Sequence, residues 1–219
     1  GGDNNVLVVE KGNKKVYLVN GQTVMPEENR KKYDLLVIRS NAVPNGMTFV
    51  DTLSHCEDKG LITCAEHPFV ESHRGMGGEI LEQHADRFDA IEGHNSQARF
   101  RNWVTRLPKI GTIFSRAGRE LNEKAKKAAE LYGKPYIATS DAHRIEDLGI
   151  SHIQINGEVV DSSEERLFSW LKEKVRGGNF ATFERYEPMF AWFSWVWKFQ
   201  IGIKGQIENF YVPSNQLKL

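Results

Sequence analysis

Short runs of aliphatic and β-branched residues alternate along the chain with longer segments whose apolar positions recur every three or four residues. The short runs predict strands over Val6–Glu10, Val16–Val19, Leu35–Arg39, Leu61–Ala65, Phe88–Glu92, Pro135–Thr139 and His152–Ile155. Runs such as Leu35–Ile38 are continuously apolar, which is typical of strands buried on both faces. Alternating strands and helices predict parallel βα units, and therefore an α/β sheet or barrel.

Three helices are predicted between the strands. Apolar residues recur at helical spacing from Ala117 to Tyr132. Ser162–Glu165 has the pattern of a capping box that opens a second helix, which Gly177-Gly178 ends. The apolar positions of Met47–Leu53 predict a third, ending near Gly60. Because no linker or repeat interrupts this pattern, we expect residues 1–219 to form a single α/β domain.

Both ends of the chain have unusual composition. The opening residues Gly1–Asn5 lead almost at once into a predicted strand, which we interpret as a tag remnant or truncated start. Near the other end, the stretch 189–203 is rich in aromatic residues and interrupted by few polar ones. It is shorter than a bilayer span. Residues 186–219 are therefore predicted to form an aromatic helix and tail that packs on the domain or in an interface.

Overall composition narrows the class of protein. The 219 residues are 40% hydrophobic with a formal net charge of zero, which suits one globular domain and gives no sign of a nucleic-acid or membrane surface. The two cysteines, Cys56 and Cys64, lack a CxxC spacing. We therefore expect buried free thiols and a reducing, cytoplasmic location.

Polar residues with metal-binding chemistry follow several of the predicted strands. They are Glu10, Ser40-Asn41, Glu66-His67-Pro68, Gly93-His94-Asn95 and Ser140-Asp141-Ala142-His143. In βα folds, functional side chains lie at the carboxyl ends of the strands. Imidazole and carboxylate together suit Zn, Fe or Mn. In an extended chain, Asp141 and His143 would point the same way. The pattern predicts a metal site where these strands end.

The segments ITCAEHPF, FDAIEGHNSQ and KPYIATSDAH resemble the last three strand motifs of the polymerase-and-histidinol-phosphatase (PHP) family. The stretch VLVVEKGNKKVYLVNG is similar to the family's third strand, and the resemblance covers about residues 6–185. It implies a distorted (β/α)7 barrel, TIM-like, that here lacks its first two strands. It also implies one to three divalent ions and phosphoester hydrolysis. The carried-over metal ligands, which would be the catalytic residues, are Glu10, His67, Asp141 and His143.

The chain departs from the family pattern in ways that bear on activity. No two of the seven histidines lie two residues apart, so the family's opening His-x-His is missing. Tyr17 and Ser40 stand where the family often has a histidine. A barrel without two strands also has open edges that favour pairing with another chain. These features leave open a degenerate PHP domain that binds a ligand or partner without catalysis.

Other residues near the strand ends are candidates for substrate contact. Arg74 and Arg144 could hold a phosphate, or could be solvated loop arginines. His94 is a candidate for substrate contact, the alternative being a structural role, whereas Glu92 and Asn95 are expected to support the ligands.

The leading prediction from the sequence is metal-dependent hydrolysis of a small phosphorylated substrate. The alternatives are the non-catalytic domain described above and an amidohydrolase-like enzyme, because similar barrels support several hydrolytic reactions. A homo-oligomer could form through the open barrel edge or the aromatic C-terminal helix.

Overall fold

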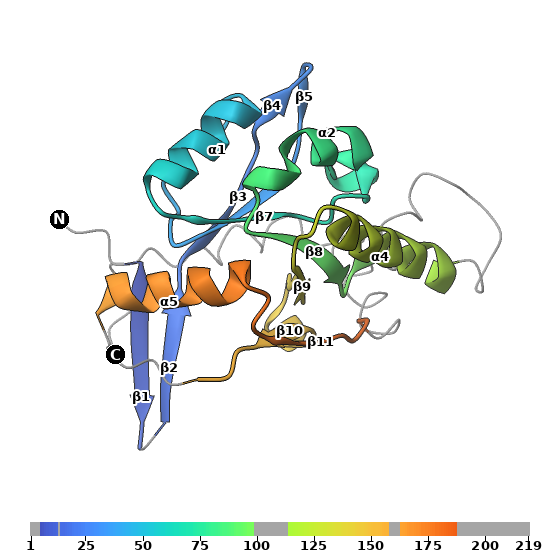
Figure 1. Ribbon diagram of the computed structural model, residues 1–219. Coiled ribbons are helices and arrows are strands. Elements are labelled where there is room, and N and C mark those ends of the chain that lie inside the picture. Colours follow the sequence, from blue (N-terminus) through green and yellow to red (C-terminus); the bar gives the residue numbers. More distant parts are fainter. Residues whose placement is uncertain (1–4, 13, 99–113, 158–162, 188–219) are drawn as a thin grey trace, which may run out of the picture. The chain divides into compact units, whose positions relative to one another are not determined.

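A five-stranded sheet forms the centre of the computed structural model, which describes residues 5–12, 14–98, 114–157 and 163–187 (Figure 1). Its strand order is β3-β6-β7-β8-β9. The strands are β3 (Gly21–Val24), β6 (Leu35–Ile38), β7 (Ile62–Ala65), β8 (Ala90–Asn95) and β9 (Tyr136–Thr139). The α/β class predicted from the sequence is confirmed. Within the described residues the sheet does not close into a barrel.

One strand of this sheet runs against the others, so the expectation of purely parallel strands is wrong. β7, β8 and β9 are mutually parallel, whereas β6 is antiparallel to both β3 and β7. The chain passes from β3 to β6 without a helix, so it returns as an antiparallel neighbour. After β6 it runs back beside β3, where the Gln22 side chain bonds both the N–H and the C=O of Val43. Residues 49–58 then return as a helix to the start of β7.

Three antiparallel hairpins lie outside the sheet. They pair β1 (Val6–Lys11) with β2 (Lys14–Val19), β4 (Glu27–Glu28) with β5 (Lys31–Lys32), and β10 (His152–Gln154) with β11 (Ala181–Phe183). In the first hairpin, cross-strand pairing puts Leu7, Val9, Val16 and Leu18 on one face. Their side chains are between 38% and 52% exposed. Hence this hairpin is a separate two-stranded sheet rather than part of a parallel βα array.

Helices pack on both faces of the five-stranded sheet. They are α1 (Phe49–Asp58), α2 (Gly77–His84), α4 (Phe114–Leu131) and α5 (Glu164–Arg176), with short 3₁₀ turns at Glu71–His73, Ala85–Arg87 and Ile145–Asp147. The larger core joins the sheet to Phe49, Leu81 and Ala125, from α1, α2 and α4. A smaller core on the other face includes Val175 of α5. The three helices predicted from the sequence are confirmed, with α2 in addition.

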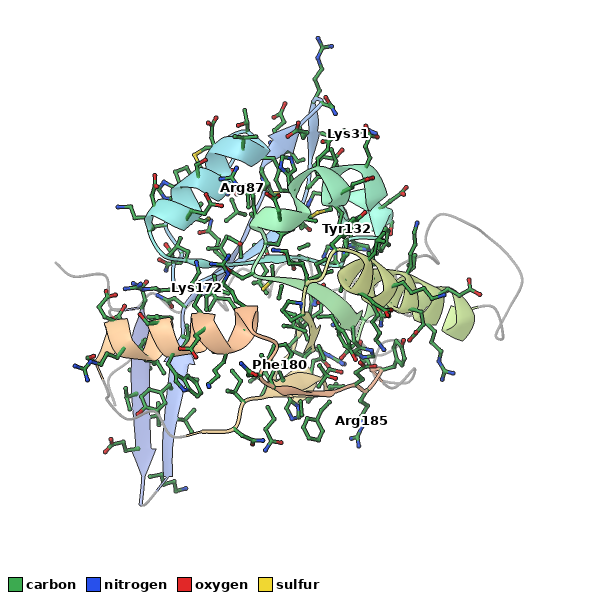
Figure 2. All side chains as sticks on the ribbon, in the orientation of Figure 1. Lys31, Arg87, Tyr132, Lys172, Phe180 and Arg185 are labelled. Carbon is green, nitrogen blue, oxygen red and sulfur yellow. The ribbon has the colours of Figure 1, made fainter. Side chains whose placement is uncertain are left out.

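The helix α5 is fixed to the sheet by ion pairs as well as by apolar contact. Lys172 donates to the carbonyl of Leu61, just before β7, and its side chain is labelled in Figure 2. The buried Asp89 carboxylate accepts from the Thr63 N–H at 2.9 Å and lies 3.1 Å from Arg176 Nε. Because Asp89 precedes β8, these contacts hold the amino end of the sheet, opposite the strand ends that carry the candidate chemistry.

The two cysteines agree with the sequence prediction. Cys56 and Cys64 are both buried free thiols. Burial raises the pKa of Cys56 to about 11 and also raises the pKa of Cys64. Among the described helices, none combines the length and apolarity needed to cross a bilayer. The aromatic stretch 189–203 lies outside the described residues, as do Gly1–Asn4.

Candidate functional site

Acidic side chains crowd the edge of the sheet where β3, β7, β8 and β9 end. Glu66 and His67 follow β7, and Asp141 lies two residues past the end of β9. Because β6 runs in the opposite direction, Asp34, which precedes it, reaches this same edge. The parallel strands and one reversed strand therefore bring residues from four segments together. We call Asp34, Glu66, His67, Glu92 and Asp141 the acidic edge.

His67 lies between two carboxylates of the acidic edge. Its Nε2 is 3.8 Å from Asp34 Oδ2 and 3.7 Å from Glu66 Oε1. The side chains of His67 and Asp34 are only 3% and 5% exposed. Its backbone φ of 27° lies in the left-handed region, which side chains other than glycine seldom adopt. Such strained residues are concentrated at functional sites.

Glu66 has a strongly raised pKa at the acidic edge. Its Oε1 accepts from Thr23 Oγ1 at 3.3 Å, whereas its buried Oε2 has no hydrogen-bond partner among the described residues. Burial, and then repulsion from Glu92, Asp34 and Asp141, raise the pKa of this carboxyl to about 8. The hydrogen bond from Thr23 opposes the rise. Burial and the neighbouring carboxyl groups thus favour the protonated form of Glu66.

Glu92 is held by hydrogen bonds from three directions. It accepts from the backbone N–H of His67, from the Thr139 hydroxyl, and from Asn95 Nδ2 at 3.1 Å. The same Asn95 amide donates to Asp141 Oδ2 at 2.9 Å. Glu92 and Asn95 therefore join the ends of β7, β8 and β9.

Asp141 and His143 lie beyond β9 rather than in it. The strand ends at Thr139, so the two-residue period of an extended chain does not orient this pair. Asp141 has a φ of 47°, and its carbonyl accepts from Gln97 Nε2 at 2.7 Å. His143 Nδ1 lies 2.8 Å from that same carbonyl and 3.7 Å from Asp141 Oδ1. Asp141 contributes to the acidic edge, and His143, with a side chain 43% exposed, lies outside it.

Glu10 is not placed with the other predicted ligands. It lies near the end of β1, opposite Lys15 in the antiparallel hairpin, and its side chain is exposed. That hairpin is separate from the five-stranded sheet. The strand itself was predicted correctly, but pairing with β2 removes it from the set of strands that end at the acidic edge.

The structure places His94 among structural partners. The ladder between β8 and β9 shifts register between Glu92 and His94, because Gly93 is an extra residue. Such a bulge changes the side to which the following side chains point. His94 is 1% exposed and packs on Tyr186, with Asn122 Nδ2 at 3.3 Å from its Nδ1. Burial lowers its pKa.

The two predicted phosphate-binding arginines differ in their surroundings. Arg144 makes a two-pronged contact with the buried Asp147, through Nε at 3.0 Å and through Nη2. Arg74 donates from Nε to Asp34 Oδ1 at 2.6 Å, and its side chain is 54% exposed. Its other N–H groups make no hydrogen bond within the part of the chain described. Of these two arginines, only Arg74 both contacts the acidic edge and is exposed to solvent.

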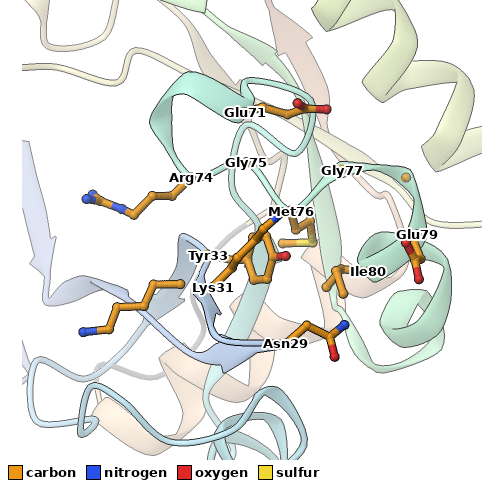
Figure 3. Close-up of a pocket in the computed structure, with 12 residues that line it drawn as sticks. Asn29, Lys31, Tyr33, Glu71, Arg74, Gly75, Met76, Gly77, Glu79 and Ile80 are labelled. Atoms are coloured by element: carbon orange, nitrogen blue, oxygen red, sulfur yellow. The ribbon is translucent and has the colours of Figure 1, made fainter.

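A cavity of about 750 Å³ lies beside Arg74 (Figure 3). It is lined by Asn29, Lys31, Lys32, Tyr33, Glu71, Arg74, Gly75, Met76, Gly77, Gly78, Glu79 and Ile80. The loop after β7 and the first residues of α2 supply eight of the twelve lining residues, and the β4–β5 hairpin with Tyr33 supplies the other four. Sequence reasoning singled out Arg74 in this region, but it did not identify the cavity.

Comparison with known proteins identifies one segment of the chain. Residues 119–175 match the model of the PHP-associated family, PHP_C. The chain carries a PHP-associated segment. The predicted resemblance to PHP proteins is thereby confirmed. The match includes most of α4, β9, Asp141, His143 and α5, about a quarter of the chain. No curated protein matches the chain.

Neither the PHP-associated segment nor the rest of the described structure contains a complete metal site. Among the described side chains, no three His, Cys, Asp or Glu residues are arranged to hold one ion. His67 and Asp141 share the acidic edge through Glu92 and Asn95, whereas Glu10 and His143 lie apart from it. The sequence placed Glu66 among the polar residues at the strand ends but did not assign it as a ligand, and Asp34 was missed.

Proposed function

We propose that this chain contributes the acidic edge of a PHP-type phosphoesterase, an enzyme that hydrolyses a phosphoester with the help of divalent ions. The supporting observation is the cluster of carboxyl groups around Glu66, a buried carboxyl with a pKa near 8 beside three other acidic groups. The PHP-associated segment supports the same family. In this proposal the five-stranded sheet is part of a distorted (β/α)7 barrel that lacks its first two strands.

The chemistry of the acidic edge fits a divalent ion, although its described side chains do not converge on one point. Zn, Fe and Mn accept imidazole and carboxylate ligands, and ligand atoms about 3.4 Å apart surround a tetrahedral ion at about 2.1 Å. The atoms of Asp34 and Glu66 nearest His67 Nε2 are 3.8 and 3.7 Å away. Small side-chain rotations would bring His67, Asp34 and Glu66 within reach of one ion. We assign them as ligands, with Asp141 as a further carboxylate.

Each neighbouring residue then has a defined task. Glu92 fixes the His67 backbone and Asn95 fixes Asp141, so the ligands keep their places when a substrate arrives. Arg74 holds Asp34 and presents its remaining donors to a phosphate oxygen. A bound divalent ion would supply an acidified water and charge stabilisation at the phosphoryl group.

A non-catalytic PHP domain is the second candidate, and two observations favour it. Glu10 is in a separate hairpin, and Arg144 is held by Asp147 rather than available for phosphate. A protein with this function would bind its ligand at the acidic edge or in the adjoining cavity without turnover.

Metal content and hydrolysis distinguish the two candidates. The purified chain is loaded with Zn²⁺ or Mn²⁺, dialysed and measured by mass spectrometry, and is compared with His67→Ala and Asp141→Ala/His143→Ala. We expect about one ion or more in the wild type and a loss in both variants. His152→Ala, which removes an exposed ring stacked on Phe183, is the matched control and retains the ion.

Hydrolysis of a generic phosphate monoester, measured on the same samples, completes the test. Turnover that follows the metal content supports the phosphoesterase. Bound metal without turnover supports the non-catalytic domain. A metal-free wild type would refute the proposed metal site.

A further inference from the structure

We propose that the cavity beside Arg74 holds the alcohol part of the phosphoester, and that this alcohol is an uncharged molecule with an apolar face and at least one further polar group. This inference rests on the proposed function, because it assumes that the phosphate is bound at the acidic edge. It adds the substrate class, which neither the family match nor the sequence motifs specify.

The cavity and the acidic edge are joined by tightly packed backbone. A Cβ on Gly75 would lie 2.6 Å from the carbonyl oxygen of His67 and 2.8 Å from that of Pro68, so the loop folds directly onto the His67 backbone. The Asp34 N–H also donates to the carbonyl of Arg74 at 3.0 Å. Arg74 lines the cavity and also bonds Asp34, so a phosphate held by Arg74 would have its ester oxygen close to the cavity.

The walls of the cavity are partly apolar. Met76 and Ile80 are 3% and 4% exposed and are anchored in the core, and the half-buried Tyr33 packs against the same core. Figure 3 shows these three side chains at the cavity, with Arg74 and Lys31 extending to one side. A volume of about 750 Å³ accommodates a ring-sized group. This surface favours a ligand with a flat or apolar face.

The charges around the cavity cancel. Lys31 and Lys32 are balanced by Glu71 and Glu79, and the charge of Arg74 is offset by Asp34. A second anionic group on the substrate would gain little electrostatic attraction from these side chains. Within the described residues the side chains of Asn29 and Tyr33 make no hydrogen bond, so an amide and a hydroxyl remain to meet a polar group on the ligand.

The reaction itself is consistent with a neutral alcohol in this position. Hydrolysis breaks the bond between phosphorus and the ester oxygen. Water supplies the hydroxyl that joins phosphorus and the proton that the departing oxygen takes up. The products are inorganic phosphate at the acidic edge and an uncharged alcohol, ROH, in the cavity.

The test uses an alcohol without phosphate, so that cavity binding is measured independently of metal and turnover. Benzyl alcohol and benzoate are titrated into the full chain, and the methyl signals of Met76 and Ile80 are followed by NMR. We expect benzyl alcohol to shift both signals and to bind about fivefold more tightly than benzoate, because benzoate must desolvate its charge. Absence of these shifts in the folded chain, or equal or tighter binding of benzoate, would overturn the inference.

Three variants sharpen the result. Tyr33→Phe keeps the ring and should bind benzyl alcohol within about twofold, whereas Tyr33→Ala should lose about fivefold, the effect of about 40 Å² of apolar contact. Glu71→Gln/Glu79→Gln should strengthen benzoate binding about fivefold and leave benzyl alcohol unchanged, because two negative charges are removed. Tyr17→Ala, in the separate β1–β2 hairpin, is the control.

The two proposals fail separately. If benzyl alcohol binds as expected and benzyl phosphate is not hydrolysed by the metal-loaded chain, the cavity assignment is supported and the proposed hydrolysis is refuted. If benzyl phosphate is hydrolysed but Met76 and Ile80 do not respond to benzyl alcohol, the cavity assignment is wrong.

Discussion

Replacing Glu66 by glutamine should stabilise the metal-free chain, and by an amount that depends on pH. The folded state raises the pKa of this carboxyl from its ordinary value of 4.5 to about 8. Below pH 4.5 the group is protonated in the folded and unfolded states alike, so folding is not penalised. As the pH rises towards 8, the unfolded chain ionises first, and the free energy of unfolding falls by about 1.36 kcal/mol per pH unit.

The magnitude follows from this slope. Between pH 5 and pH 7, both below the folded-state pKa, the wild type loses about 2.5 kcal/mol, slightly less than two full units of slope because the unfolded carboxyl is only partly ionised at pH 5. Glu66→Gln cannot titrate and avoids this loss. The stability difference between variant and wild type should therefore grow by about 2.5 kcal/mol over this range.

Urea unfolding in the presence of a chelator, at pH 5 and pH 7, measures this difference. With a typical slope of about 2 kcal/mol per molar urea, the gap between the two midpoints should widen by about 1 M at pH 7. Glu130→Gln, an exposed carboxylate on α4, is the control and should change little. An equal gap at both pH values would refute the view that the acidic edge disfavours the ionised form of Glu66.

Three further substitutions test the packing around the site, each by urea unfolding. Gly75→Ala should cost about 2 kcal/mol or more, because the new methyl group would lie 2.6 Å from the His67 carbonyl oxygen, and an unchanged midpoint would contradict this close approach. Thr48→Ala should lower the free energy of unfolding by about 1 kcal/mol, because it removes the hydroxyl that accepts from the Asp51 N–H and caps α1. Thr48→Ser keeps a hydroxyl and should retain most of this stability. Asp89→Asn should lower the free energy of unfolding by about 2 kcal/mol at low salt, because Lys172 and Arg176 of α5 lose their buried carboxylate partner. A change below about 0.5 kcal/mol would show that these ion pairs contribute little.

The sequence was sufficient to find the buried strands and the long helices, but not the direction of every strand. The residues Leu35–Ile38 are apolar on both faces, as a central strand requires, and this pattern is the same whichever way the strand runs. The first strand of the sheet, Gly21–Val24, was missed because it is short and partly polar. The strand ending in Glu10 was found, yet its pairing with β2 depends on contacts that local periodicity does not encode.

The candidate site was predicted only in part, because the direction of each strand could not be read from the sequence. Searching the residues after each strand led to His67 and Asp141, which follow parallel strands. Asp34 precedes its strand, so that search could not reach it once β6 was assumed parallel. Glu66 was noted at the end of its strand but was not assigned as a ligand, because the family resemblance pointed to His67 beside it. The inward placement of His94 depends on the bulge at Gly93, for which an isolated glycine in a strand was the available signal.

The hydrogen bonds that converge on Glu92 have a consequence for motion. The amide of His67, the Thr139 hydroxyl and the Asn95 amide all donate to one buried carboxylate, so none of these strand ends can separate without leaving that carboxylate short of a hydrogen bond. The ends of β7, β8 and β9 should therefore open together, as one cooperative unit. Hydrogen exchange of the His67 amide would then be as slow as that of amides in the middle of β8, although His67 lies in a loop.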